Sequence, residues 1–169
     1  MHIPVNVQRI IQRTEQQNVN LPYEVLTMFS RRTGNIVFSL KGDKEKVPVS
    51  RIIKHAERYR HERNIITHNH PLEISPLSPK DLALGFIFRC SQIRTTDLKR
   101  RVHLMELPDI ITSSDVNKAQ KLAGKYKAET EKQFTLQELL PVLGRMREAF
   151  GKKFPGLTFR EESLDNLNC

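Results

Sequence analysis

A strand, loop and helix near the middle of the chain constrain the fold more than any other feature of the sequence. The apolar run NIITH at 64–68 predicts a short strand, and Pro71 turns the chain away from its end. The segment NHPLEISPLSPKD contains three prolines and no periodicity, which predicts a loop. Ser78 at the N-cap position and Pro79 at the first helical position then predict a helix over 79–89. This order of elements is typical of an α/β core.

Helical and strand patterns alternate on both sides of this unit, up to about residue 110. Apolar side chains at helical spacing, runs of β-forming residues and turn residues such as Gly34 mark each element. The expected elements are a helix at 5–17, a β-hairpin at 23–40, a helix at 51–63 capped by Ser50, and strands near 91–96 and 101–107. We therefore expect an α/β (α+β) core over residues 1–110.

The pattern becomes helical beyond this core. Residues 114–132 are strongly charged, and Thr135 and Glu138 form a T-x-x-E capping box that opens a helix with an apolar stripe ending at Phe150. Gly151, and then Pro155-Gly156, are expected to end this helix. We expect residues 111–169 to be a helical C-terminal extension, whose apolar stripe packs on the core or on a partner.

Charge and cysteine content narrow the class of protein. The 28 Lys and Arg residues against 19 Asp and Glu residues give a net charge of +9, which suits either an acidic partner, nucleic acid included, or charges spread over solvated helix faces. The scattered basic positions favour the second interpretation. The N-terminal residues do not resemble a secretory signal, no apolar run could span a bilayer, and two cysteines give no disulfide framework. A cytoplasmic protein is expected, although export by a bacterial secretion system is left open.

Three side chains suggest a metal site. His68 and His70 are two residues apart at a strand end, so both imidazoles can face one point. Asp81 lies 11 residues beyond His70, in the first turn of the predicted helix. Two histidines, one aspartate and an open position are typical of catalytic zinc, one ion per chain. Each residue alone has a simpler explanation, since Ser78 and Asp81 suit a helix cap, and it is the combination that favours zinc.

A carboxylate upstream could serve such a site. Glu24 lies in the strand-forming run YEVLTMFS, where a charge is disfavoured unless a partner accepts it. Glu24 could act as a general base on a zinc-activated water. The alternative is that Glu24 marks the solvated end of the strand beside Pro22.

These residues resemble the JAMM/MPN (JAB-domain) metalloproteases. The family pattern is an upstream glutamate, then H-x-H-P, about six residues, and S-x-x-D; here Glu24 is followed by His68-Asn69-His70-Pro71, six residues and Ser78-Pro79-Lys80-Asp81. Asn69 makes the chain similar to the bacterial, phage and RadC-like branch. The resemblance covers roughly residues 20–108.

The resemblance implies both a fold and a function. It implies a cytidine-deaminase-like mixed sheet flanked by helices, in which the two histidines and the aspartate bind zinc. It also implies that Glu24 activates water and that Ser78 stabilises the oxyanion of a peptide or isopeptide bond under hydrolysis. The substrate would be a protein, such as a conjugate of ubiquitin or a ubiquitin-like tag, so the activity would be deubiquitinase-like.

Two other functions remain open. A DNA-associated role, as in RadC-like members, would account for the charge of +9. The string His-Asn-His fits an HNH nuclease poorly, because the next histidine is His103, in a predicted strand. A non-catalytic interaction module would need neither Glu24 nor zinc chemistry.

Overall fold

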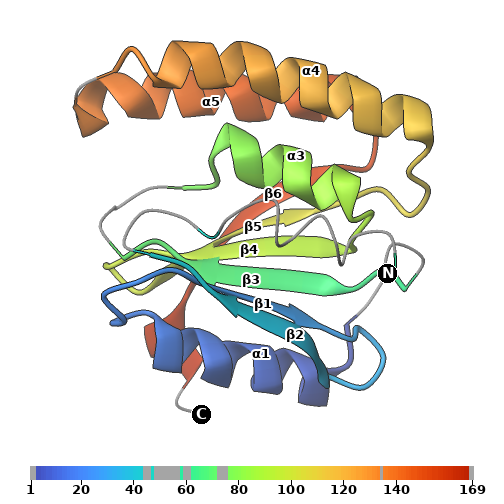
Figure 1. Cartoon of the computed structure of the whole chain (residues 1–169), viewed down its shortest axis with the longest axis vertical. Helices are drawn as coiled ribbons and strands as arrows, with labels where there is room; N and C mark the ends of the chain where they lie inside the picture. The colour runs from blue at the N-terminus through green and yellow to red at the C-terminus, as the bar shows by residue number, and fades with distance from the viewer. Residues whose placement is uncertain are drawn as a thin grey trace.

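A single mixed sheet organises the protein. The computed structural model describes residues 3–43, 47, 58, 62–71, 76–133 and 135–167. Its six strands lie in the order β2-β1-β3-β4-β5-β6, with β3 and β4 parallel and the other neighbouring pairs antiparallel (Figure 1). The strands are β1 (Val25–Phe29), β2 (Ile36–Lys41), β3 (Ile65–Asn69), β4 (Gln92–Thr96), β5 (Arg101–Glu106) and β6 (Thr158–Ser163).

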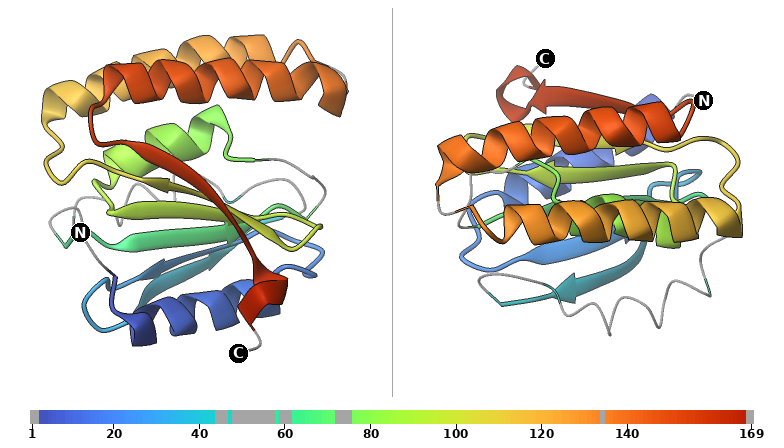
Figure 2. Two further views of the ribbon diagram at one scale, coloured as in Figure 1. Left: turned by 180° about the vertical axis from the view of Figure 1, so that it is seen from behind. Right: turned by 90° about the horizontal axis from the view of Figure 1, so that it is seen from above.

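Helices cover both faces of this sheet. Figure 1 shows α1 (Val5–Asn18) on one face and α3 (Pro79–Ile87) on the other. The α4 helix (Ser113–Thr130) and the α5 helix (Leu136–Lys153) lie side by side beyond α3, as the view from above shows (Figure 2). A short 3-10 helix, η1 (Leu164–Leu167), follows β6. The architecture is thus a mixed α/β sheet flanked by helices. Among the described helices, none combines the length and the apolar character that crossing a bilayer requires.

Strand β3 has hydrophobic side chains on both faces, since all five of its residues are buried. Ile66 joins the larger core on the α3 side, and Ile65 joins a smaller core that Val7, Ile11 and Phe29 form under α1. Alternate residues of a strand point to opposite faces, so His68 shares the α3 face with Ile66. Packing on both faces therefore fixes which way the two histidines of this strand end can point.

The α4–α5 pair shares its core with α3. Phe86 of α3 has its ring centroid 4.4 Å from that of Phe154, and Phe150 lies 5.6 Å from Phe154. Burial of these three phenylalanines anchors the C-terminal helices on α3, the helix whose N-cap is Ser78 and whose first turn contains Asp81. The apolar stripe of α5 is therefore intramolecular core at Val142, Leu143, Met146 and Phe150, while Leu136 and Leu140 stay exposed.

Most of the expected elements are confirmed within one or two residues. The helix expected at 51–63 lies almost wholly outside the described residues. The expected helical C-terminal extension at 111–169 contains the helices α4 and α5, but it also contains the strand β6, which was not expected. Strand β6 pairs with β5 at the edge of the sheet (Figure 2). No residue of TFREES in β6 is buried, so the strand carries little apolar periodicity.

Candidate metal centre

The two histidines at the end of β3 face each other. The Nε2 atoms of His68 and His70 lie 3.1 Å apart, with His68 buried and His70 half-buried. The backbone N–H of His70 donates to the carbonyl of Thr96 at 2.9 Å, which continues the β3–β4 pairing past the last residue of β3. The strand geometry thus brings the two imidazoles together, as the spacing of two residues predicts.

Asp81 reaches the same point from the start of α3. Its Oδ1 lies 3.0 Å from His68 Nε2, and its Oδ2 lies 3.8 Å from His70 Nε2. The carboxylate is buried and also closes the capping box of α3, because Oδ2 accepts the backbone N–H of Ser78 at 2.7 Å. The helix cap and the cluster therefore use one side chain, so neither explanation of Asp81 excludes the other.

The donor set fits a divalent metal ion. One ligand atom each of His68, His70 and Asp81 lies within 4.8 Å of the others. Tetrahedral zinc with bonds of about 2.0–2.1 Å places ligand atoms roughly 3.3–3.4 Å apart, close to the distances observed here. Two imidazole nitrogens and one carboxylate are the ligands that zinc takes at catalytic sites, with a fourth position for water. The cluster could therefore hold such an ion.

Charge interactions inside the cluster are strong. Burial opposes ionisation of Asp81, but His68 and His70, together with the hydrogen bond to Ser78, hold the pKa of its carboxyl well below its usual range. Burial likewise opposes protonation of His68, yet Asp81 and Glu24 outweigh it and raise the pKa of this imidazole. The site is thus built to stabilise positive charge, on a proton or on a metal ion.

The second ring nitrogen of His68 departs from the usual pattern of metal ligands. A ligating histidine commonly donates its other N–H to a carboxylate or a carbonyl oxygen. His68 Nδ1 is buried and has no hydrogen-bond partner within the described part of the chain.

Glu24 lies next to the cluster. The sequence predicted that it lies within a strand, but β1 begins one residue later, at Val25. The Glu24 backbone N–H donates to Asp43 O and its carbonyl accepts from Gly42 N–H, both at 2.8 Å. The side chain is 12% exposed, with Oε1 4.0 Å from His68 Nε2. Burial raises the pKa of Glu24 and the charge of Asp81 adds to the effect, although His68 opposes it. A carboxylate with a raised pKa is a better proton acceptor.

Ser78 is the N-cap of α3, as expected. Its Oγ accepts the backbone N–H of Asp81 at 3.3 Å, and the residue is half-buried. A hydroxyl that accepts this bond keeps its own O–H for another acceptor. Ser78 is therefore fixed beside Asp81, and its hydroxyl group can still donate one hydrogen bond.

Asn69, which lies between the two histidines, has a structural role that the sequence did not predict. Its side chain is buried and bonds to the backbone on both sides of Glu24, at Tyr23 O and Val25 N. Residue type alone gives no signal for such bonds, because any polar side chain can bond to a backbone. The only sequence cue is its position between two candidate ligands.

Comparisons with known proteins give no match: neither a family model, nor a curated protein, nor a solved structure is significantly similar to this chain. The resemblance to the JAMM/MPN metalloproteases therefore rests on the motif residues and their spacing.

Proposed function

We propose that this protein is a zinc-dependent metalloprotease of the JAMM/MPN type that hydrolyses a peptide or isopeptide bond. The observation that carries the proposal is the convergence of His68, His70 and Asp81 with Glu24 beside them. These residues come from three separate segments of the chain, and the Nε2 atoms of the two histidines are 3.1 Å apart. Two facing imidazole nitrogens and two carboxylates form a poor structural core but a good cation site.

The residues of the chain suit amide hydrolysis. When bound, zinc supplies Lewis acidity at the site and makes water a better nucleophile. Glu24 would take the proton of the attacking water and deliver it to the nitrogen of the leaving amine. The Ser78 hydroxyl would donate to the carbonyl oxygen as that atom becomes negative. A protein substrate, including one joined to ubiquitin or a ubiquitin-like tag, provides both kinds of amide bond.

Elemental analysis and cleavage assays of the full chain test the proposal. We expect about one zinc per chain and hydrolysis of at least one substrate among isopeptide-linked di-ubiquitin, ubiquitin with a fluorogenic C-terminal amide, and fluorogenic peptides. The double variant His68→Ala/His70→Ala should lose zinc, whereas His103→Gln, which changes a buried histidine of β5, should keep it. Unchanged zinc in the double variant would refute the assignment of the ligands.

One further variant separates an enzyme from a non-catalytic metal module. Glu24→Gln should retain zinc and lose turnover, because the amide cannot accept the proton. A variant with full zinc and undiminished turnover would exclude Glu24 as the general base.

A further inference from the structure

The side chain of Asn69 continues the pairing between β1 and β3 where the regular ladder ends. The paired residues run from Phe29 opposite Ile65 to Leu26 opposite His68. One step further, Asn69 Oδ1 accepts the Val25 N–H at 2.7 Å and Asn69 Nδ2 donates to Tyr23 O at 3.0 Å. The side-chain amide thus binds the backbone as a neighbouring peptide group would.

These two bonds flank Glu24 in the sequence. Tyr23 O and Val25 N belong to the peptide groups on either side of Glu24. In extended backbone, Glu24 shares a face with Leu26, whose partner in the ladder is His68. The amide of Asn69 therefore holds the backbone in the position that directs the Glu24 carboxylate to the cluster, where Oε1 lies 4.0 Å from His68 Nε2.

The opposite side of this segment is bonded to the end of the β1–β2 hairpin. Glu24 exchanges two backbone hydrogen bonds of 2.8 Å with Gly42 and Asp43. Gly42 and Asp43 directly follow β2, which is an edge strand of the described sheet and does not neighbour β3. These bonds therefore hold Glu24 to the end of β2 and not to β3, which carries His68. Asn69 makes the direct link between the backbone at Glu24 and β3, which carries His68.

We propose that Asn69 is a positioning residue that fixes Glu24 relative to the metal ligands. The inference rests on the proposed function, in which Glu24 moves the proton. Since one residue couples the ligand strand to the base, a shift of either would be transmitted to the other. A displacement of about 1 Å at a reacting group can lower a rate by roughly a hundredfold.

The experiment compares Asn69→Ala with Asn64→Ala in the full chain. Asn64 is a matched control because it is also buried, directly precedes β3 at its other end, and donates to Met28 Sδ at 3.5 Å, away from Glu24. Asn69→Ser, which retains a polar group too short to bridge Tyr23 and Val25, replaces Asn69→Ala if the latter does not fold.

The first measurement needs no activity. Amide hydrogen exchange of the metal-free protein, followed by NMR, should be faster at Val25 by about tenfold or more in the Asn69 variant, and should change little at Val25 in Asn64→Ala. Unchanged exchange at Val25 would show that the bond does not hold this segment, and would overturn the inference.

The second measurement is a double-mutant cycle with Glu24→Gln on the zinc-loaded protein. We expect Asn69→Ala to lower kcat by about 10–100-fold with zinc content and KM retained, and to have little further effect in the Glu24→Gln background. Independent, multiplicative effects overturn the positioning role. An inactive wild type overturns the proposed function instead and the catalytic part of the inference with it, so the two failures are distinct.

Discussion

The backbone N–H of Ser78 donates to Asp81 Oδ2 at 2.7 Å while Asp81 Oδ1 lies 3.0 Å from His68 Nε2. The start of α3 therefore presents the Asp81 carboxylate in a fixed orientation, since the carboxylate cannot rotate without losing its bond to Ser78. The α4 helix opens with a capping box of the same geometry, made by Thr112 and Asp115 on the surface. The two boxes differ in the neighbour of the second carboxylate oxygen, which for Asp81 is the imidazole of His68.

Asp81→Asn should separate capping from metal binding. The asparagine oxygen can still accept the Ser78 N–H, but the negative charge that zinc needs is gone. We expect zinc affinity to fall by more than the roughly 10–100-fold that changes outside the ligand set produce. Competition with a chromogenic chelator measures it, with Asp115→Asn as the control that leaves affinity unchanged. Equal zinc affinity in Asp81→Asn and the wild type would show that the carboxylate is only a cap.

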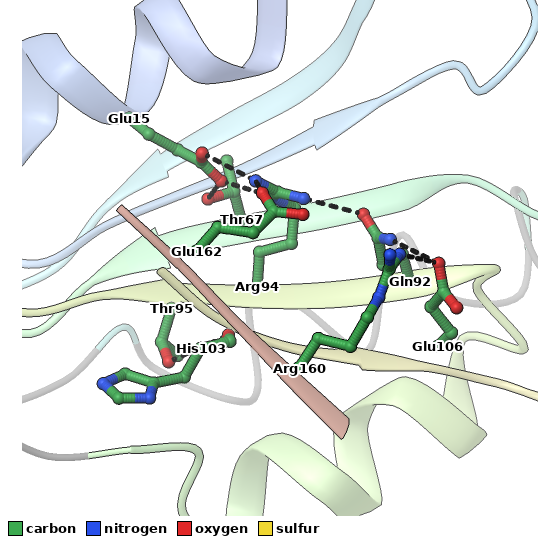
Figure 3. Close-up of polar contacts among 9 residues, drawn as sticks. All are labelled: Glu15, Thr67, Gln92, Arg94, Thr95, His103, Glu106, Arg160 and Glu162. Atoms are coloured by element: carbon green, nitrogen blue, oxygen red, sulfur yellow. Dashed lines mark hydrogen bonds and ion pairs between the residues drawn. The ribbon is translucent and has the colours of Figure 1, made fainter. Parts of the chain in front are cut away.

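A buried ion pair joins α1 to the sheet face that this helix covers, opposite the face of α3. Arg94 donates to the two carboxylate oxygens of Glu15 at 2.6 and 3.1 Å and to Glu162 Oε2 at 3.0 Å, and the Thr67 hydroxyl also donates to Glu15 (Figure 3). Glu15 is 1% exposed and Arg94 is 2% exposed. This network connects α1, β3, β4 and β6.

Arg94→Met should lower the free energy of unfolding by about 3–5 kcal/mol, because it leaves the Glu15 carboxylate buried without its cation. The double variant Arg94→Met/Glu15→Met should recover most of that loss, since apolar side chains can replace a buried pair. Urea denaturation at neutral pH measures both. Arg145→Ala, which breaks an exposed pair with Glu129, should change stability by only about 0–1 kcal/mol. A double variant no more stable than Arg94→Met would contradict this account.

Much of the fold and the convergence of His68, His70 and Asp81 could be predicted from local patterns. Proline and capping residues mark α3 because their backbone preferences act within a few residues. The strand alternation that directs His68 and His70 to one point is equally local. Of the predicted end of α5, Gly151 lies inside the helix, because an exposed glycine costs a helix only about 1 kcal/mol. The helix ends at Lys153, before Pro155-Gly156.

Features that depend on distant partners could not be predicted. The pairing of β6 with β5 joins segments that are more than fifty residues apart, and the sequence of β6, which has no buried residue, shows no apolar alternation. The bonds of Asn69 reach Tyr23 and Val25, whose backbone atoms carry no residue-specific signal. Sequence patterns identified the groups that could bind a metal, but not the contacts that hold the backbone at Glu24.

The protein should lose stability in acid as Asp97 becomes protonated. This buried carboxylate accepts the N–H groups of Lys99 and Arg101 at 2.9 and 3.1 Å, and its Oδ2 lies 3.1 Å from His103 Nε2. Burial alone would raise the pKa of Asp97, but the hydrogen bonds from His103 and Arg101 outweigh it and lower the pKa.

A folded-state pKa below the unfolded value of about 3.9 contributes stability that is present above that value and is lost as the pH falls through the folded pKa. The wild type should therefore be more stable than Asp97→Asn at pH 7, and the difference should narrow below about pH 4. Urea denaturation between pH 7 and pH 3 measures the difference. A difference in stability that stays constant between pH 7 and pH 3 would contradict a lowered pKa of Asp97.

Cys90 should be chemically inert in the folded protein. Burial raises the pKa of its thiol to about 12, and the Sγ donates to Gly85 O at 3.4 Å. Only about one molecule in ten thousand would then carry the reactive thiolate at pH 8. Cys169→Ser leaves Cys90 as the single thiol, which should react with a disulfide reagent only after unfolding in denaturant. Rapid labelling of this variant under native conditions would show that the α3 end opens readily.

Zinc binding should release protons, most strongly at mildly acidic pH. Burial alone would lower the pKa of His68, but Asp81 and Glu24 outweigh it and raise the pKa above 6.5. A zinc ligand must be the neutral imidazole, so the metal has to displace the proton that His68 carries below this pKa. Apparent affinity should therefore fall as the pH decreases, and more protons should be released at pH 6 than at pH 8. Calorimetric titration in two buffers of different ionisation enthalpy counts them, with His103→Gln as a control that leaves the count unchanged. The same release at both pH values would mean that His68 does not hold a proton in competition with the metal.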